Sequence, residues 1–346
     1  CIAIQANQNE MHGGQSVPNF DYAMAEGVVR TFRKEYFKAM EKYARVKFDV
    51  DAETASEFIH TMKNALGTGV RMGTADEYGK KLEDWVNGGD ILCGERVLLA
   101  EDMRKAHETV VDMALKETEG ETYQSMEALI HNLNTMNSRA GAQVPFSSVN
   151  YGTDCSPEGR MVIKNLLLAT DAGLGNGETP IFPVQIFKVK EGVNYNPGDP
   201  NYDLFRLAVR TSAKRLFPNF SFLDAPFNLQ YYKEGDYNTE VAYMGCRTRV
   251  MGNHYDPSRE VTCGRGNLSF VSINLPRLGI KAHGDIQAFY ESLDKMIDLA
   301  CRQLLHRFSI QCRKKVRNYP FLMGQGIWLD SDKLDVDDSV AEVLKH

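Results

Sequence analysis

One cysteine and one asparagine stand in segments whose composition suits chemistry. Cys246 lies in Met244–Asn253, "MGCRTRVMGN", and Asn267 ends the stretch "GRGN" twenty-one residues after that cysteine. A thiolate nucleophile needs a base, and neither a histidine nor an acid stands beside Cys246, although Arg247 and Arg249 would lower the thiol pKa from about 8.5. A buried, inert thiol is the simpler interpretation of the residue alone. The glycines around it instead predict a loop, neither helix nor strand, and loops on a rigid scaffold often carry chemistry.

Two adjacent serines are candidates for ligand binding. Ser147 and Ser148 lie in Gln143–Asp154, "QVPFSSVNYGTD", which has the composition of a strand. Because successive side chains of a strand point to opposite faces, only one of the two can face a given pocket. A hydroxyl there would hold a ribose or phosphate oxygen. The alternative is that these serines are exposed edge residues.

Two glycine-rich segments have competing interpretations. "HGGQS", His12–Ser16, permits either a close backbone approach to a ligand, because glycine tolerates positive φ and leaves space, or a turn between two helices. "GLGNGETP", Gly173–Pro180, follows a helical pattern and precedes a strand pattern. A dinucleotide fingerprint has the opposite order, so we interpret this segment as a helix C-cap with a tight turn.

The seven cysteines form no metal-binding pattern. There is no CxxC pair and no short Cys/His cluster, so no zinc site is predicted in this chain. The odd, scattered set favours reduced thiols over a disulfide framework. Cys301 and Cys312 are eleven residues apart, nearly on one face of a helix, and we expect buried apolar thiols there.

The composition limits the class of protein. The chain has 346 residues, of which 43% are hydrophobic and 25% charged, as in globular proteins with a large core. Its net charge of −6 argues against a nucleic-acid partner. No apolar run approaches the roughly 20 residues that a bilayer span needs, so we expect no membrane partner and a cytoplasmic location. Because the sequence begins with Cys1, we expect an excerpt of a longer chain.

Residues 1–140 are predicted to be mainly helical. Apolar residues recur every three to four positions, and Asp51 can cap the segment that follows it. The helical segments are 20–48, 52–66, about 97–116 and about 122–133.

After Gly141, apolar runs that are typical of buried strands alternate with helical patterns. The predicted strands are "VPFSSVNY", "IFPVQIFKVK" and "LSFVSINL". The predicted helices are "SPEGRMVIKNLLLATDAG", "DPNYDLFRLAVRTSAKRLF" and "DIQAFYESLDKMIDLACRQLLHRF". This alternation predicts an α/β fold, either a barrel or a doubly wound sheet, with function at strand ends and loops.

Together these segments resemble the anaerobic (class III) ribonucleoside-triphosphate reductases, which are glycyl-radical enzymes. The family's motifs follow in order along the whole chain: "HGGQS", "HNLNTMNSRAGAQVPFSS", "GLGNGETPIFP", "GDPNYD", "MGCRTRVMGN", "GRGNLSFVSINLPR" and "GQGIWLDSDKL". The resemblance implies a ten-stranded α/β barrel with a finger loop near 240–253. It implies one truncated catalytic domain, with residues 1–140 on the dimer and effector side and 141–346 as the barrel core.

The resemblance also implies roles for individual residues. Cys246 matches the loop cysteine that becomes a thiyl radical. Asn267 matches the active-site asparagine that hydrogen-bonds the ribose hydroxyls, and an amide can both donate and accept there without bringing a charge into a dry cavity. Ser147, Ser148 and Gly266 are assigned to substrate binding.

The implied reaction is the reduction of ribonucleoside triphosphates to deoxyribonucleoside triphosphates. A glycyl radical oxidises the cysteine, the thiyl abstracts the 3′ hydrogen, the 2′ hydroxyl leaves as water, and formate or a second thiol supplies the reducing equivalents. The family further implies a homodimer, a radical-SAM iron–sulfur activating protein, and ATP and deoxynucleotide effectors. Gln8, Lys34 and Lys38 are our candidates for the effector site.

The sequence departs from the family pattern in several places. We expect it to lack the C-terminal glycyl-radical segment with its zinc site, the N-terminal ATP-binding domain and the second active-site cysteine. Cys1 is too close to "HGGQS" to be that cysteine, and Cys263 is expected to be a packing residue. Asn137 stands where the family has histidine. The fragment alone is therefore expected to be inactive.

Two alternative functions remain. A pyruvate formate-lyase-like enzyme would carry two adjacent cysteines in its finger loop, whereas Cys246 is followed by Arg247. A noncatalytic nucleotide-binding and dimerising fragment is the second alternative. A stop codon directly after His346 would favour that fragment, and a downstream "RxCGY"-like segment would favour the reductase.

Overall fold

The chain divides into two compact units in a computed structural model that describes residues 1–11, 13–137, 142–245 and 248–346. Each unit is assembled from segments that are distant in sequence. Unit 1 comprises Cys1–Pro18, Thr135–Ser148 and Pro226–His346, and unit 2 comprises Asn19–Asn134 and Val149–Ala225. The division at residue 140 that the sequence suggested stays a prediction.

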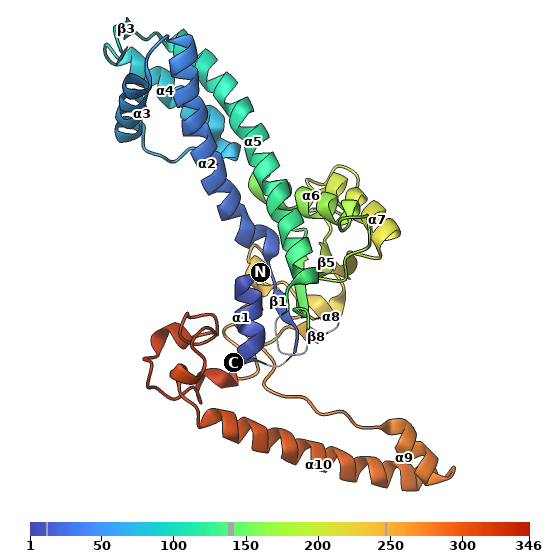
Figure 1. The fold of residues 1–346 in the computed structure, drawn as a ribbon. Helices are drawn as coiled ribbons and strands as arrows, with labels where there is room; N and C mark the ends of the chain where they lie inside the picture. The colour runs from blue at the N-terminus through green and yellow to red at the C-terminus, as the bar shows by residue number, and fades with distance from the viewer. Residues whose placement is uncertain (12, 138–141, 246–247) are drawn as a thin grey trace. The chain divides into compact units, whose positions relative to one another are not determined.

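Long helices dominate unit 2 (Figure 1). The helix predicted over 20–48 is confirmed, and Asp51 caps the next helix as predicted, because its carboxylate accepts the Thr54 N–H at 2.8 Å. The helices are α2 Phe20–Lys47, α3 Ala52–Leu66, α4 Ala75–Asn87, α5 Ala100–Thr135, α6 Pro157–Ala172 and α7 Tyr202–Arg215. A short hairpin, β2 Leu92–Cys93 with β3 Arg96–Val97, precedes α5.

The predicted break between two helices near residues 116–122 is wrong, because α5 is continuous there. The intervening residues are mostly charged helix formers, and a Cβ at Gly120 would meet open space. Thr118 and Thr122 are buried, and the Thr122 hydroxyl donates to the Thr118 carbonyl at 2.7 Å. A helical glycine costs about 1 kcal/mol, which the packing of this buried face offsets.

Helices α2 to α5 share one hydrophobic core. Phe32, Tyr36 and Met40 recur every four residues on α2 and have no exposed surface, as on the core face of an amphipathic helix. The Tyr36 hydroxyl lies 2.8 Å from His107 Nδ1 of α5. Burial lowers the pKa of His107 and so favours its neutral form.

The main sheet has the strand order β1-β4-β5-β6. β4 Ser147–Tyr151 and β5 Val184–Val189 confirm two predicted strands, and every residue of both is buried, as in interior strands. β5 pairs in parallel with β6 Asn219–Phe222, and α7 connects them. The α/β class is therefore confirmed. A ten-stranded barrel would need more strands than the described residues form.

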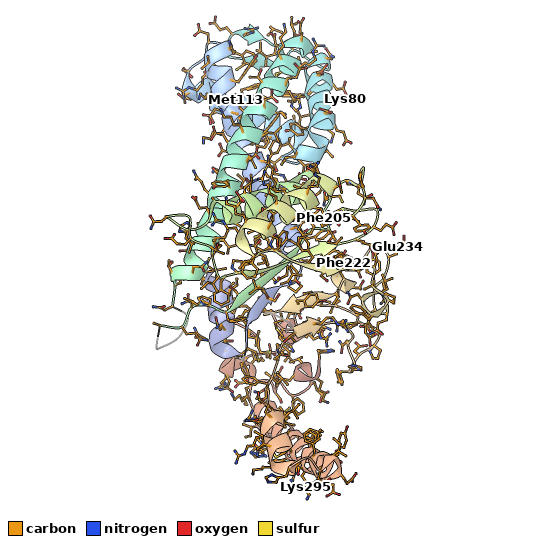
Figure 2. The ribbon with its side chains drawn as sticks, turned by 90° about the vertical axis from the view of Figure 1, so that its right-hand side faces the viewer. Lys80, Met113, Phe205, Phe222, Glu234 and Lys295 are labelled. Carbon is orange, nitrogen blue, oxygen red and sulfur yellow. The ribbon has the colours of Figure 1, made fainter. Side chains whose placement is uncertain are left out.

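Helix α7 covers the parallel pair with aromatic side chains. Phe205, labelled in Figure 2, lies with its ring centroid 6.1 Å from that of Phe187 and 5.9 Å from that of Phe220. The predicted C-cap after α6 is also confirmed, since Gly173 has a φ of 84° and its N–H donates to the Ala169 carbonyl at 3.2 Å.

A buried carboxylate organises the turn after β4 in unit 2. Asp21 is 1% exposed and accepts the N–H groups of Gly152, Thr153 and Asp154 at 2.8, 3.1 and 3.1 Å. Burial raises the pKa of Asp21, while the Gly152 N–H and the charge of Lys188 oppose that shift. One side chain thus satisfies three buried donors.

Unit 1 contains short elements and two helices near its C-terminal part. These elements are α1 Ile2–Glu10, β1 Gln15–Val17, α8 Pro226–Leu229, β7 Ala242–Met244, β8 Thr248–Val250, α9 Leu275–Ala282 and α10 Ile286–Cys312. The helix predicted over 285–308 is confirmed as α10, with Asp285 as its N-cap. A smaller core lies around Trp328, which is 2% exposed. No helix among the described residues has the length and apolarity that a membrane crossing requires.

Two expectations for this part are wrong. "LSFVSINL" forms no strand, because no neighbouring strand pairs with it among the described residues, and Phe270 is 69% exposed. Helix α10, on which Figure 2 labels Lys295, has no buried residue. Cys301 is accordingly exposed and Cys312 only half-buried, not buried as predicted.

Candidate active site

The predicted catalytic cysteine lies outside the described residues, but both of its flanks are visible. Cys246 and Arg247 are not described, whereas β7 and β8 on either side pair antiparallel, with Met244 opposite Thr248. The prediction that Met244–Asn253 is neither helix nor strand is therefore wrong for the paired residues. Cross-strand hydrogen bonding holds both ends of this segment.

Ser148 anchors the residue that precedes the cysteine. Its hydroxyl accepts the N–H of Gly245 at 3.0 Å and donates to the Tyr243 carbonyl at 3.4 Å. The Ser147 hydroxyl instead donates to the Pro145 carbonyl at 3.1 Å. The two serines thus have different partners, as strand alternation predicts, but both are fully buried, so the exposed-edge alternative is wrong.

The glycines of "HGGQS" allow a close approach of two backbones. His12 lies outside the described residues. A Cβ on Gly14 would lie 2.6 Å from the Phe146 ring and 3.1 Å from the Gly245 Cα, and real Cβ atoms do not tolerate the shorter distance. The segment joins α1 to β1, so the alternative of a turn between two helices is wrong.

Asn267 lies near Gly13, the first of the same two glycines. A Cβ built on Gly13 would lie 3.9 Å from Asn267 Nδ2, and the asparagine is half-buried. Gly13 has a φ of 81°, a backbone conformation that glycine adopts without strain. Gly13 therefore lies near the active-site asparagine candidate, and Gly14 lies near Gly245, the chain neighbour of Cys246.

Gly266, predicted to bind substrate, has a different contact. A Cβ at this position would lie 2.8 Å from the ring of Trp328 and 3.8 Å from Met11 Cγ. Its missing side chain lets the indole pack against the backbone beside Asn267. The role of Gly266 in substrate binding stays a prediction.

Sequence reasoning missed two residues of this region, Arg265 and Trp328. Both line a cavity of about 70 Å³ in unit 1, together with Asn7, Ser16 and Tyr243. Trp328 donates from Nε1 to the Val343 carbonyl at 2.7 Å. An arginine between two glycines and one of only two tryptophans were the available signals.

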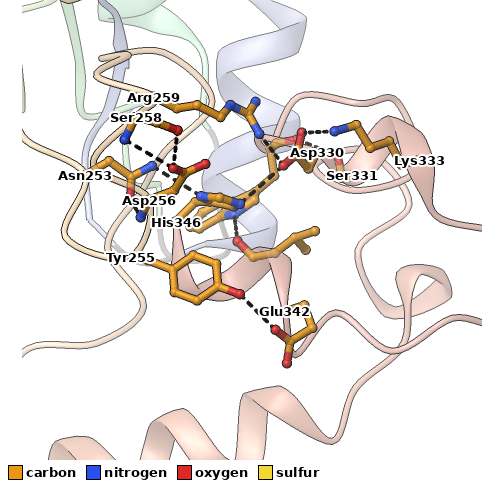
Figure 3. A network of polar contacts seen from close by, with 12 residues as sticks. Asn253, Tyr255, Asp256, Ser258, Arg259, Asp330, Ser331, Lys333, Glu342 and His346 are labelled. Atoms are coloured by element: carbon orange, nitrogen blue, oxygen red, sulfur yellow. Dashed lines mark hydrogen bonds and ion pairs between the residues drawn. The ribbon is translucent and has the colours of Figure 1, made fainter.

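A charged network fixes the loop that leads to "GRGN" (Figure 3). Asp330 pairs with Arg259, with Lys333 at 2.8 Å and with His346 Nε2 at 3.3 Å. The hydrogen bonds from Arg259 and then Lys333 lower the pKa of Asp330 to about 2. Asn253 Nδ2 lies 3.2 Å from His346 Nδ1, which ties the start of the loop to the same network.

The predicted effector residues are distributed over both units. Gln8 is 1% exposed on α1 in unit 1. Lys34 and Lys38 lie on α2 in unit 2 and line an open pocket of about 460 Å³. Both ammonium groups pair with the buried Glu35, at 3.1 and 3.0 Å. Arg30, Arg33 and Lys63 add positive charge to this pocket.

No group of three or more His, Cys, Asp or Glu side chains in the described part of the chain is arranged to hold a metal ion. The groups described at the candidate site are backbone, amide, hydroxyl and guanidinium groups.

Comparisons with known proteins give the family. The family model described as anaerobic ribonucleoside-triphosphate reductase matches residues 1–346. The enzyme of that name from Salmonella typhimurium is 33% identical over 234 residues, which are 67% of this chain and 32% of that protein. The Escherichia coli enzyme is 32% identical over 227 residues, 65% of this chain and 30% of its own length.

The same name belongs to a protein of Enterobacteria phage T4 that is 32% identical over 241 residues, 68% of this chain and 38% of its own length. The chain thus spans about a third of the length of these curated relatives. The family match extends over every segment of the site described above. This chain belongs to the anaerobic ribonucleoside-triphosphate reductase family.

Proposed function

We propose that this chain is the active-site core of an enzyme that reduces ribonucleoside triphosphates to deoxyribonucleoside triphosphates under anaerobic conditions. In this proposal Cys246 is the thiol that becomes a radical, and Asn267 holds the ribose hydroxyls. Family membership supports the reaction class. The observation that carries the residue assignment is that Gly13 lies near Asn267 while its neighbour Gly14 lies near Gly245.

The described residues have defined tasks in this reaction. Ser148 holds the backbone next to Cys246 through the Gly245 N–H. The Asn267 amide donates to one ribose hydroxyl and accepts from another, and it carries no charge that would need solvation. Gly14 leaves room for the two backbones to approach.

The reaction is a balanced two-electron reduction. A glycyl radical elsewhere in the protein would supply the oxidant for the Cys246 thiol. The resulting thiyl takes the 3′ hydrogen atom, the 2′ hydroxyl leaves with a proton as water, and two electrons come from formate, which becomes carbon dioxide, or from two thiols, which become a disulfide. The cysteine finally returns the hydrogen atom to the 3′ carbon.

The complete protein is proposed to close a ten-stranded barrel around this core. Exposed apolar side chains support that proposal, because unpartnered apolar surface of this extent is uncommon on a folded protein. Phe270 is 69% exposed, and α10 exposes Ile286 and Leu305 at 65% and 66%. The remaining two thirds of the relatives' length is sufficient to supply further strands.

The partners and cofactors follow from the same proposal. They are a homodimer in the cytoplasm, a radical-SAM activating protein, a zinc site outside this chain, and ATP and deoxynucleotide effectors. The pocket around Lys34 and Lys38 is the proposed effector site, because cationic side chains from α2 and α3 can bind a triphosphate. Gln8 belongs to unit 1, and its assignment rests on sequence alone.

The test uses the complete enzyme that contains this chain, activated without oxygen. Cys246→Ser is expected to abolish deoxyribonucleotide formation. Cys301→Ser, at an exposed cysteine of α10, is the matched control and should keep activity within about twofold of the parent. Appreciable turnover by Cys246→Ser would remove this cysteine from the role. If the parent enzyme binds nucleotide but never turns over, the noncatalytic alternative is correct.

A further inference from the structure

A small, partly open cavity in unit 1 is larger than ordinary packing requires. It has a volume of about 70 Å³ and is lined in part by Asn7, Gln15, Ser16, Arg265 and Trp328. One water molecule needs only about 10–15 Å³ by this kind of measure. The space therefore suits a ligand of a few heavy atoms and excludes a whole nucleotide.

Arg265 brings to the cavity a positive charge that no acidic side chain balances in the described part of the chain. Its Nε donates to the His346 carbonyl oxygen at 2.9 Å and its Nη1 to the Gly252 carbonyl at 2.8 Å. Within the described residues, no Asp or Glu side chain forms an ion pair with this guanidinium. Glu260 acts on it only from a greater distance, and its Oε2 accepts the Asn253 N–H at 3.0 Å.

Such a cation is costly to keep in a half-buried position. Removal of a charge from water is unfavourable unless an opposite charge or several hydrogen bonds compensate for it. Burial indeed lowers the pKa of Arg265. The two carbonyl oxygens use Nε and Nη1, so Nη2 is the group left for a ligand in the part of the chain that is described.

Asn7 supplies a second polar group, whose side-chain oxygen has no hydrogen-bond donor among the residues that the structure describes. Its Oδ1 is buried, and no hydrogen-bond partner for it exists among the described residues. A half turn of the amide presents Nδ2 instead, so Asn7 can donate to an anion or accept from a protonated one. An unsatisfied buried amide costs about 1–3 kcal/mol, which a ligand in the cavity would recover.

We propose that this cavity binds a small oxyanion, either a carboxylate or a single phosphate group, with Arg265 as its main ligand and Asn7 as its second. A guanidinium suits both groups, since its planar N–H donors match two oxygens. Arg265 lies two residues before Asn267 in the sequence. Anion binding here does not depend on reductase activity, so it can be correct even if the proposed function is wrong.

Tryptophan fluorescence gives a direct measurement. Trp328 lines the cavity, and Trp85 is the other tryptophan of the chain, so Trp85→Phe leaves one reporter at the site. We expect acetate or orthophosphate to change the emission saturably. Acetamide, the neutral isostere of acetate, should not. A tighter response to acetate identifies a carboxylate site, and a tighter response to orthophosphate identifies a phosphate site.

Three variants distinguish a specific anion-binding site from a nonspecific effect of positive charge on binding. Arg265→Gln should weaken binding at least tenfold, whereas Arg249→Gln, an exposed arginine on β8 of the same unit, should change it less than twofold. Asn7→Asp should also weaken binding at least tenfold, because its negative charge repels an anion while Arg265 remains. If Arg265→Gln does not fold, Asn7→Asp carries the test. The proposal is overturned if neither anion gives saturable binding, or if Asn7→Asp binds as tightly as the parent.

Discussion

The helical core of unit 2 and the glycine cluster of unit 1 are held together in different ways. In unit 2, Phe32, Tyr36 and Met40 of one helix are fully buried in a continuous apolar core. In unit 1, Gly14 lies close to the backbone of Gly245, whose N–H donates to the Ser148 hydroxyl. The core of unit 2 buries a large apolar area. The glycine cluster of unit 1 instead lets two main chains approach closely.

This difference shows where each kind of residue is indispensable. A large side chain stabilises unit 2 by filling space, and its loss leaves a cavity. At Gly14 the absence of a side chain is the requirement, and its gain creates a clash. Each unit has its own tryptophan, Trp85 in unit 2 and Trp328 in unit 1, so their stabilities can be followed separately.

The largest effect is expected in the core of unit 2. Phe32→Ala should lower the free energy of unfolding of this unit by about 3–5 kcal/mol, because a fully buried aromatic ring is removed. Urea unfolding of a Trp328→Phe background, followed through Trp85 emission, measures it. Val46→Ala, at a 68% exposed position of the same helix, should change it by less than about 0.5 kcal/mol. Equal losses in both variants would contradict the proposed core.

A smaller effect is expected at the glycine cluster of unit 1. Gly14→Ala should cost about 1–3 kcal/mol, because the new methyl group would displace Phe146 or Gly245. Unfolding of a Trp85→Phe background, followed through Trp328, measures the change. Gly279→Ala in α9 is the control, since a Cβ there meets nothing within 4 Å and alanine is the better helix former. Destabilisation by the control, with none at Gly14, would refute the close approach.

The smallest effect is the pH dependence of unit 1 through Asp330. Its pKa falls from an ordinary 3.8 to about 2 in the folded state, so the unfolded state binds the proton more readily. The stabilisation is complete above about pH 5 and is lost as the pH falls through about 2. Because the side chain remains 17% exposed, solvent screening leaves about 1 kcal/mol of the roughly 2 kcal/mol that the shift would give.

Unfolding curves of the Trp85→Phe protein between pH 5 and pH 2 test this dependence. Asp330→Asn should remove the Asp330 contribution, so its stability should fall less steeply over the same range. An identical slope in the two proteins would show that the Arg259–Asp330 pair contributes nothing measurable.

Sequence periodicity predicted several helices and strands, including α10, although that helix has no buried residue. Helices α2, α6, α7 and α10 and strands β4 and β5 were predicted because 3.6- and 2-residue patterns are encoded locally. "LSFVSINL" has the same local pattern but pairs with no strand in the described structure, since pairing depends on a partner elsewhere. The break expected near Gly120 failed for the converse reason, because buried Thr118 and Thr122 favour one continuous helix.

The candidate site was predicted in part. Family motifs identified Asn267, Ser148 and the glycines; in the structure Asn267 lies near Gly13, and Ser148 bonds the Gly245 N–H, while their roles stay predictions. Arg265 and Trp328 were missed, because the spacing of single residues does not report that a guanidinium lacks an acidic partner among the described residues or that an indole covers Gly266. Such facts arise only from packing between distant segments.

The hydroxyl of Ser148 limits how the candidate active site can vary between related proteins. It accepts the N–H of Gly245 and donates to the carbonyl of Tyr243. Both bonds involve main-chain atoms of the stretch before Cys246, so they do not depend on the side chains there. Substitutions at Tyr243 can therefore retain the attachment, whereas replacement of Ser148 by alanine removes it. Ser148 of the buried strand β4 therefore holds the backbone just before Cys246, and the side chains of residues 243–245 are not needed for this attachment.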